Sequence, residues 1–488
     1  MSVADDVLTS PEAGAKVIRG SAVRVAANAS GILLGLATAT LLLHALGVAD
    51  AGRYVTVMSL VSIASSLADA GLNATGSRDL ALCRPEDRGA LVANFLGLRL
   101  LITPFALALI VLFALLAGYQ SNMVVGTMLA GAGLFLVAIS DAALLRLTVE
   151  LRNGSLAVVD LLKQIVQLAG VALLVALGAH LTAFFSIQIA VGIAVFVVAS
   201  ILTRALPVPR FDRARQRALL SKSLPIAVAL VLGQVYFRLV IVLMSLIASS
   251  KQTGYFGGSL RAMETLINIP LLVATVALPM LAAAARDDRA RLRYAIEGLS
   301  EGAVIAGVLV IIVTIRAAEP VMSLLGGSSF RPSGAVLRIQ VGALLFISLY
   351  QIWTASLIAL ERQRDLVLVN VAALVGVGVF AAALVPQFGA QGGAVASVMG
   401  DALLAGLIFW RLRRFAGKIV LRLGFLARVA IAAALASGVL FVSGLPDLVA
   451  AALAGLVFIA VGQLIGMVPS EVRDALGPRG WLARRNAT

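Results

Sequence analysis

The chain has 488 residues, of which 61% are hydrophobic and 13% are charged, and its formal net charge is +15. A soluble domain has roughly half apolar and about a quarter charged residues, so this composition excludes a water-soluble globular protein. One cysteine, Cys83, excludes an internal disulfide framework, and two histidines are too few for a histidine-rich metal site. We therefore expect an integral membrane protein that uses no metal and no cofactor.

Apolar runs recur along the whole chain, each long enough to cross a roughly 30 Å hydrocarbon layer as a helix of about 20 residues. Barrel strands would instead be about ten residues long with alternating polarity. The sequence therefore predicts an all-α fold with about fourteen transmembrane helices. The expected spans are 20–44, 54–75, 92–117, 123–147, 157–178, 181–203, 223–247, 255–281, 299–319, 333–358, 366–385, 391–412, 425–443 and 447–468.

The basic residues predict the orientation of these spans. If the amino terminus is cytoplasmic and the spans alternate, about 32 of the 39 lysines and arginines fall on the cytoplasmic side. The positive-inside rule favours this arrangement, with both termini in the cytoplasm. A basic inner face that meets anionic lipid explains the net charge, so we expect no nucleic-acid partner.

The chain also shows signs of an internal repeat. The outer turn "LGVADAGRY" (46–54) resembles "IASSKQTGYF" (247–256), and "LVALGAHLTA" (174–183) resembles "LVPQFGAQGGA" (384–394). Matching turns on one membrane face indicate two parallel six-helix lobes. The predicted segments are a cytoplasmic tail (1–19), an N-lobe (20–203), a cytoplasmic inter-lobe loop (204–222), a C-lobe (223–412), two further helices (413–468) and a second cytoplasmic tail (469–488).

Two stretches carry a family resemblance. "LGVADAGRYVTVMSLVSIASSLADAGLNATGSRDLA" (46–81) is similar to the first outer turn and second helix of bacterial polysaccharide or oligosaccharide flippases. These are the Wzx-like members of the multidrug/oligosaccharidyl-lipid/polysaccharide (MOP) exporter superfamily. Residues 223–282 resemble helices seven and eight of the family through their prolines, the Tyr-Phe-Arg triplet at 236–238 and the Gly-Tyr pair at 254–255. Relatives often carry an aspartate where this chain has Val240, so the resemblance does not extend to ion coupling through that position.

The resemblance implies a V-shaped transporter of two lobes, with a central cavity lined by helices one, two, seven and eight. Its substrate would be a polyprenyl-diphosphate-linked oligosaccharide, flipped from the inner to the outer leaflet of the bacterial inner membrane by alternating access. Such a protein is not an enzyme. Glycan polymerases and glycosyltransferases are the protein partners that the resemblance leaves open.

Charged side chains at membrane depth are costly, so each one needs a reason. Arg238 lies roughly 22 Å into its span from the inside and Arg261 about 10 Å from the outside, which predicts similar depths in the outer half of the bilayer. Arginine suits a diphosphate because its planar fork donates two parallel hydrogen bonds. The alternative is an Arg261–Glu264 pair that neutralises itself. The candidate cavity residues are Arg238, Arg261, Gln234, Glu264, Asn268, Arg24 and Asn28.

The inner end of the second span predicts a gate. Asp69 lies about 24 Å down its helix, at the height of Arg24 on the preceding helix, which predicts a bridge between them. Asn73 extends this polar face by one turn. The bridge is either a static clasp or one that opens during transport. Pro270 and Pro279 are candidate hinges, since proline removes a backbone donor, and static curvature is the alternative.

Three further acids lie within spans. Asp160 and Lys163 are one turn apart near an inner end, which predicts a structural pair. Asp141 lies in the inner half of its span. Asp401 has no obvious cation on its own face, so it either pairs across helices or is protonated and relays protons.

Competing functions remain open at this point. A cation-coupled multidrug exporter of the same superfamily would need acids in its cavity, whereas helices seven and eight carry two deep arginines and one glutamate. A membrane glycan polymerase or ligase would need a sizeable outer loop, and the outer loops here are short. A scaffold would have little reason to keep arginines at depth. A lipid-linked glycan flippase is therefore the favoured function.

Overall fold

The computed structural model describes residues 11–84, 86–150, 152–203, 208–287, 289–417, 419, 422–440 and 444–467. The side chains of residues 11–29, 279, 287, 363 and 364 are not among the described parts. Within the described ranges every regular element is a helix, and most of the helices are long and apolar. The predicted all-α membrane class is confirmed.

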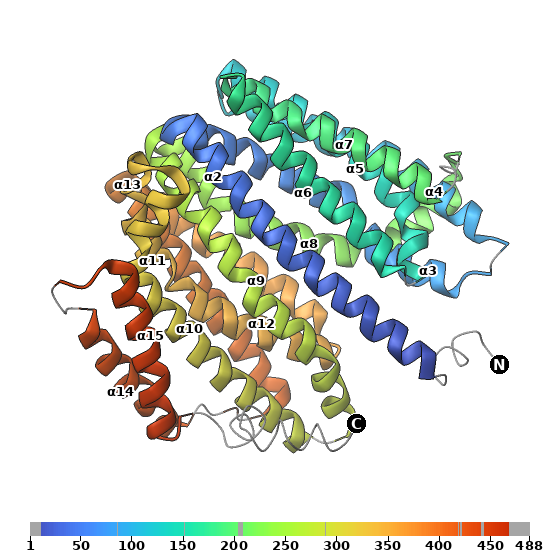
Figure 1. Cartoon of the computed structure of the whole chain (residues 1–488). Coiled ribbons are helices and arrows are strands. Elements are labelled where there is room, and N and C mark those ends of the chain that lie inside the picture. The colour runs from blue at the N-terminus through green and yellow to red at the C-terminus, as the bar shows by residue number, and fades with distance from the viewer. Residues whose placement is uncertain are drawn as a thin grey trace. The chain divides into compact units, whose positions relative to one another are not determined.

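The helices gather in two compact units, whose boundary falls inside α9 between Gly257 and Gly258. The first unit holds α2 (Pro11–Asp69), α3 (Leu72–Leu82), α4 (Arg88–Leu116), α5 (Ser121–Val149), α6 (Asn153–Ala176), α7 (Leu181–Thr203), α8 (Arg213–Ile247) and the start of α9 (Ser250–Asp287) (Figure 1). The second unit holds the rest of α9, α10 (Arg289–Gly326), the short 3₁₀ helix η1 (Ser328–Phe330), α11 (Ser333–Gln340), α12 (Ala343–Ala359), α13 (Gln363–Ala416), α14 (Leu423–Val439) and α15 (Asp447–Leu464). The lobe limits at 20–203 and 223–412 stay predictions.

Eleven helical stretches of the described chain are long and apolar enough to cross a membrane, and α14 is a shorter apolar helix. Two of the eleven are interrupted by a glycine with a positive φ, namely Gly47 (φ +66°) in α2 and Gly389 (φ +55°) in α13. These breaks fall where the sequence predicts turns between spans. Fourteen crossings stays a prediction, because it needs both interrupted stretches to cross twice and α14 to cross once.

Small residues let α5 and α7 pack closely within the first unit, where the two helices lie side by side (Figure 1). A Cβ atom on Gly133 would lie 2.1 Å from the carbonyl oxygen of Gln188, and one on Gly192 would lie 2.6 Å from the carbonyl oxygen of Gly133. Both distances are shorter than any real contact, so only glycine fits. This is the close helix approach expected of small residues in lipid.

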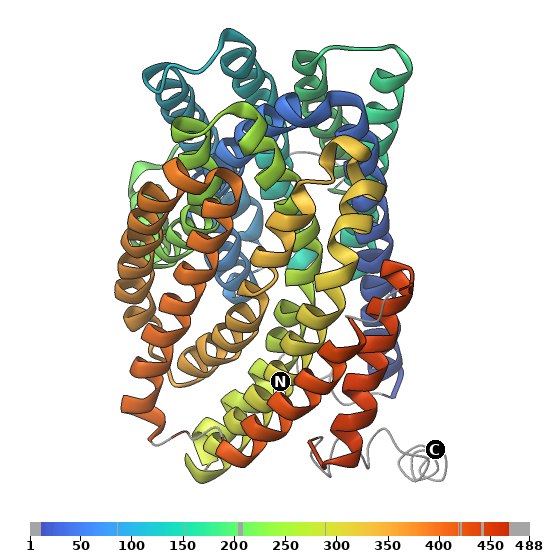
Figure 2. The same cartoon turned by 90° about the vertical axis from the view of Figure 1, so that its left-hand side faces the viewer.

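In the second unit, α14 and α15 pair with each other and pack on α10, as the red helices of Figure 2 show. Arg316 on α10 joins this contact through an ion pair of 3.2 Å from its Nε to Oδ1 of Asp447, the first residue of α15. The last two helices are thereby attached to their own unit through a polar contact as well as apolar packing.

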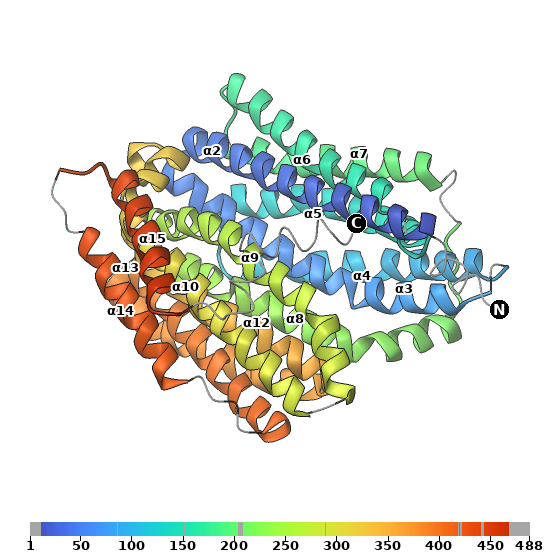
Figure 3. The ribbon, with the colours of Figure 1, turned by 60° about the horizontal axis from the view of Figure 1, so that its bottom comes forward.

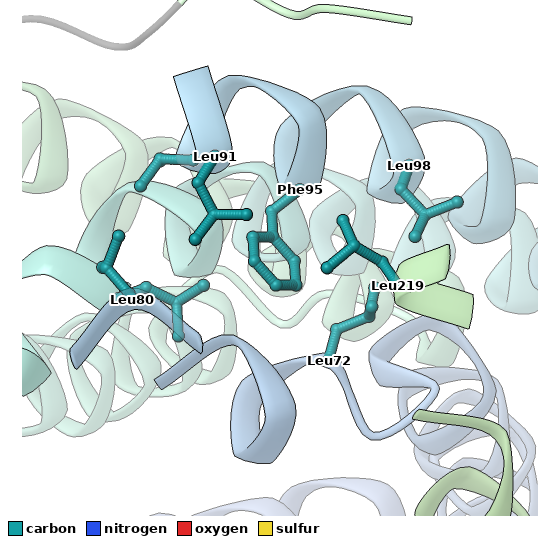
Figure 4. Close-up of a cluster of buried hydrophobic side chains, with 8 residues drawn as sticks. Leu72, Leu80, Leu91, Phe95, Leu98 and Leu219 are labelled. Carbon is teal, nitrogen blue, oxygen red and sulfur yellow. The ribbon is translucent and has the colours of Figure 1, made fainter. Parts of the chain in front are cut away.

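A buried apolar cluster anchors α3 and α4, which lie side by side in Figure 3. Figure 4 shows its labelled members, which come from α3, α4 and α8: Leu72, Leu80, Leu91, Phe95, Leu98 and Leu219. Phe95 is 1% exposed and its ring fills the space beside Gly76, where a Cβ would lie 3.0 Å from the ring. Packing of this kind fixes the rotation of α4, and with it the direction of the polar side chains that α4 carries.

The predicted inter-lobe loop is partly helical, because α8 begins at Arg213 rather than near residue 223. The carboxylate of Asp212 accepts the backbone N–H groups of Ala214 and Arg215 at 3.0 and 3.2 Å, which caps the helix. The preceding residues pack on α4, since the backbone N–H of Asp212 donates to Oδ1 of Asn94 at 3.2 Å. Charged residues at 213–222 therefore extend the helix beyond its apolar part.

Candidate functional site

The end of α2 turns the chain sharply into α3. After Asp69, Ala70 and Gly71 have φ values of +45° and +67°. A left-handed conformation is uncommon for a residue with a side chain, so the turn at Ala70 depends on the structure around it. Oδ1 of Asp69 accepts the backbone N–H of Asn73 at 3.3 Å, which satisfies one of the free donors in the first turn of α3.

Arg99 of α4 joins this turn to α5. Its Nη2 donates to Oδ1 of Asp69 at 2.9 Å and to Oδ1 of Asn73 at 2.8 Å. Its Nη1 donates to the backbone carbonyl of Ala138 at 3.1 Å and lies 3.6 Å from Oδ2 of Asp141. The Arg99 side chain is only 2% exposed. We call Asp69, Asn73, Arg99 and Asp141 the arginine clasp; it ties α2, α3, α4 and α5 together.

The arginine clasp brings two carboxylates to one guanidinium. Asp69 and Asp141 are 22% and 30% exposed, so both are partly withdrawn from water. A buried charge pair is stable only when its geometry and hydrogen bonds offset the loss of hydration. Arg99 makes three hydrogen bonds through Nη1 and Nη2, whereas its Nε has none. Removal of Arg99 would leave two like charges near each other without the cation.

The structure gives Asp69 a partner that the sequence did not predict, Arg99. The side chains of Arg24 and Asn28 lie outside the described residues, and their roles stay predictions. Arg99 is one of the roughly 32 basic residues that the positive-inside rule places on the cytoplasmic side. The missed signal is its position about 16 Å along α4 from Arg88, which is too deep for a simple boundary residue.

Two of the candidate cavity residues lie on α8 in the first unit. Gln234 and Arg238 are both half-buried and share one helix face at i and i+4. The guanidinium carbon of Arg238 lies 5.0 Å from the centroid of the Phe237 ring, within the range of a cation–π interaction. Val240, which stands where relatives carry an aspartate, is a buried apolar residue at 4% exposure.

Three more candidates come together on α9 in the second unit. Nη1 of Arg261 donates to Oε2 of Glu264 at 3.0 Å, which is the ion pair foreseen as the alternative to a free arginine. Arg261 is 31% exposed and Glu264 is 21% exposed. The side-chain amide of Asn268 donates to the backbone carbonyl of Glu264 at 2.9 Å. These side chains form one polar face along two turns of α9.

The candidate hinges lie within α9, whose helix continues through both positions. Pro270 is buried, whereas the side chain of Pro279 lies outside the described residues. A hinge role for either proline stays a prediction.

The structure also places the three other acids that the sequence puts within spans, Asp160, Asp141 and Asp401. Nζ of Lys163 lies 3.8 Å from Oδ1 of Asp160, which confirms the predicted pair. Asp141 belongs to the arginine clasp, and Asp401 is buried in α13 at 8% exposure. Among the described residues, no group of three or more His, Cys, Asp or Glu side chains gathers as a metal site.

Long apolar helices in two units, with charged and amide side chains at membrane depth, define a multi-pass membrane protein with the fold of the MOP superfamily. The structure is similar to the lipid II flippase MurJ in an inward closed conformation, with a TM-score of 0.77, 12% identity, and coverage of 90% of this chain and 98% of that one. It is also similar to a multidrug resistance MATE transporter of the MOP superfamily in an inward-facing conformation (TM-score 0.64, 14% identity, 79% and 94% coverage). A multidrug resistance MATE transporter in an outward-facing conformation is also similar, with a TM-score of 0.53, 17% identity, and coverage of 81% of this chain and 93% of that one.

A family model described as "Polysaccharide biosynthesis protein" matches residues 41–335. The chain therefore belongs to this polysaccharide biosynthesis family. No curated protein matches the sequence. The predicted resemblance is thus confirmed for the polysaccharide family, and the likeness to transporters of the MOP superfamily is confirmed at the level of the fold.

Proposed function

We propose that this protein flips a polyprenyl-diphosphate-linked oligosaccharide from the inner to the outer leaflet of a bacterial inner membrane by alternating access. It carries out no covalent chemistry, and both of its termini face the cytoplasm. The basic residues at the inner ends of its helices meet anionic lipid. Glycosyltransferases supply the cargo and a glycan polymerase uses it on the outer side.

The observation that carries this proposal is the combination of family and fold. A chain of the polysaccharide biosynthesis family has the fold of a lipid II flippase over 90% of its length. A polysaccharide precursor on a lipid carrier faces the same physical barrier as lipid II, because its polar head group must cross the hydrocarbon layer. A transporter fold meets that need without an active site.

The charged side chains at depth supply the recognition. Arg238 in the first unit and Arg261 in the second each offer a guanidinium suited to an anionic diphosphate, and Gln234 and Asn268 extend their own helix faces with amides. Glu264 holds the Arg261 guanidinium in position until the cargo arrives. The arginine clasp is the inner gate, because it joins the cytoplasmic end of α2 to three other helices.

A multidrug exporter is the second candidate, favoured by the likeness to MATE transporters. A cationic drug needs carboxylates in contact with it. Asp69 and Asp141 are already bound to Arg99, and Glu264 is bound to Arg261. Each of these three acids already has an arginine beside it, although two of them share Arg99. On α8 and α9 two candidate arginines stand against one candidate acid, which suits an anionic cargo better.

Transport by purified protein in proteoliposomes tests the proposal. The vesicles carry a fluorescent polyprenyl-diphosphate-linked oligosaccharide, and a membrane-impermeant quencher reports how much of it reaches the outer leaflet. We expect the wild-type protein to accelerate this exchange, and Arg238→Ala and Arg261→Ala each to slow it. Arg331→Ala, which removes a 70% exposed arginine paired to Glu319, is the matched control and keeps the wild-type rate.

Each outcome has a definite meaning for the two candidates. Export of a cationic dye without movement of the lipid-linked glycan favours the multidrug function. Normal glycan transport by both Arg238→Ala and Arg261→Ala excludes these arginines from the cavity while it leaves the flippase function intact.

A further inference from the structure

A cavity of about 330 Å³ lies within the first unit, among α2, α5, α6 and α7. Its lining is unusually polar for an apolar helical unit: Ser62, Ser65, Lys163, Gln164, Gln167 and Gln188. The other lining residues are apolar, and none of the lining residues is a carboxylate. None of the predicted cavity or gate residues whose side chains the structure describes is among them.

Backbone packing holds the cavity open. The close glycine contact between α5 and α7 fixes the backbone of Gln188, whose carbonyl oxygen lies where a Cβ of Gly133 would stand. On the other side, Gln164 faces Gly31 and Gly35 of α2, where added Cβ atoms would lie 3.8 and 3.9 Å from its side chain. Glycines on two helices thus leave room for amide side chains that bulkier residues would displace.

The glutamines retain unused hydrogen-bonding groups. Nε2 of Gln188 donates to Oε1 of Gln167 at 3.0 Å, which orients both amides. An amide has two donors and one acceptor oxygen with two lone pairs, so most of their capacity stays free. Among the described residues, the structure gives these two amides no other partner and gives the half-buried Gln164 side chain none. Gln167 lies about 21 Å along α6 from Asn153, at a depth where an unpaired amide is costly.

The charge in the cavity is small. Among the residues that the structure describes, Lys163 supplies the one cationic group of the lining; Asp160, which is not a lining residue, lies 3.8 Å from its Nζ and is 71% exposed. A cavity without carboxylates does not select a cation. A diphosphate would find one paired lysine and no arginine in the lining, in contrast to α8 and α9. The remaining amides and hydroxyls both donate and accept, which matches a ligand that carries several neutral hydroxyl groups.

We propose that this cavity binds an uncharged sugar ring. Its volume is at the lower end of the range for small-molecule sites, so it takes one or two rings and excludes the polyprenyl chain. Gln164, Gln167 and Gln188 bind ring hydroxyls, and Ser62 and Ser65 line the face supplied by α2. The sugar ring belongs to the glycan part of the lipid-linked cargo; this assignment rests on the proposed function.

Binding of free sugars is tested with a cysteine at the edge of the cavity. In a Cys83→Ala background, Ser65→Cys places a single thiol on an exposed position of the cavity lining. The rate at which a maleimide modifies this thiol is measured on the full-length protein in nanodiscs. The probes are neutral monosaccharides and disaccharides at millimolar concentration, with the uncharged polyol glycerol as the reference. We expect sugars to slow modification more than glycerol does, and Gln164→Leu and Gln167→Leu each to weaken this protection about tenfold, since each removes hydrogen bonds of roughly that worth.

Gln387→Leu on α13 is the matched control, because Gln387 is exposed and donates to the carbonyl of Ala383 on its own helix. It should leave the protection unchanged. Size-exclusion profiles in detergent identify any variant that fails to fold. If Gln164→Leu fails to fold, Gln164→Asn replaces it, because asparagine keeps the amide on a shorter side chain. Equal protection by sugars and glycerol, with unchanged rates in the glutamine variants, overturns the sugar site.

Transport assays separate this inference from the proposed function. Loss of glycan transport in Gln164→Leu and Gln167→Leu, with protection also lost, supports a sugar ring of the cargo. Sugar protection by a wild-type protein that moves no lipid-linked glycan supports the sugar site and overturns the proposed function. Wild-type glycan transport by both glutamine variants overturns the cavity as a cargo site and leaves the flippase function standing.

Discussion

Arg99 in the first unit and Arg261 in the second are both arginines within membrane-length helices, but their surroundings differ. Arg99 is 2% exposed and contacts side chains from α2, α3 and α5. Arg261 is 31% exposed and pairs with Glu264 on its own helix. A pair that crosses between helices holds those helices together, whereas a pair within one helix leaves its partners accessible to a ligand. We therefore expect substitutions of Arg99 to act mainly on stability, and substitutions at Arg261 to act on the proposed binding of cargo.

Arg99→Met should have the largest effect on stability. Methionine fills much of the volume but leaves Asp69 and Asp141 without their cation, and breaking a buried ion pair in this way costs about 3–5 kcal/mol. Thermal unfolding of the purified protein in detergent measures the loss. The triple variant Arg99→Met, Asp69→Asn, Asp141→Asn should recover most of it, because it removes the unpaired charges as well.

Arg99→Lys separates the effect of the charge from the effect of the side-chain shape, because lysine keeps the positive charge but has no planar fork that can bridge two helices. We expect its stability to lie between wild type and Arg99→Met. If Arg99→Met unfolds at the wild-type temperature, the arginine clasp does not hold these helices together.

The two acids of the arginine clasp should differ in their effects. Asp69 accepts a hydrogen bond from Arg99 at 2.9 Å, so Asp69→Asn should cost about 1.5–3 kcal/mol, the usual worth of a bond to a charged group. Asp141 lies 3.6 Å from the guanidinium, and its removal also relieves repulsion between the two acids, so Asp141→Asn should change stability by less than about 1 kcal/mol. The same unfolding assay compares them, and a reversed order would contradict the geometry.

Glu264→Gln should have the smallest effect on stability and a clear effect on transport. The Arg261–Glu264 pair is partly exposed and lies within one helix, so its loss should change the free energy of unfolding by less than about 1 kcal/mol. Without the negative charge of Glu264 beside it, Arg261 should bind anionic cargo more tightly and release it more slowly. Flipping rates at low and high cargo density measure this: the variant should match the wild type at low density and fall below it at high density.

The sequence predicted local features well. The spans follow from hydropathy, the breaks at Gly47 and Gly389 follow from turn residues, and the pairs Asp160–Lys163 and Arg261–Glu264 follow from one-turn spacing. Each of these needs information from only one stretch of chain. The physical rules that set them act over a few residues.

Features that depend on which helices are neighbours were missed. Arg24 was predicted as the partner of Asp69 because the two lie at the same height on consecutive spans, a pairing that stays a prediction; the bond from Arg99 was not predicted, because it depends on the packing of α3 on α4. The cavity among α2, α5, α6 and α7 was not predicted either, because its polar lining comes from four helices. Gln164 and Gln167 are neutral, so a search for charges within spans passes over them.

The burial of Arg99 also bears on how the chain enters the membrane. A lone arginine at the centre of a span costs roughly 2.5–3.5 kcal/mol during insertion. Asp69 and Asn73 are synthesised before Arg99, so α2 and α3 can present both acceptors when α4 leaves the translocon. Asp141 follows with α5 and completes the group. The order of these residues along the chain thus places two acceptors in the membrane before the arginine that needs them.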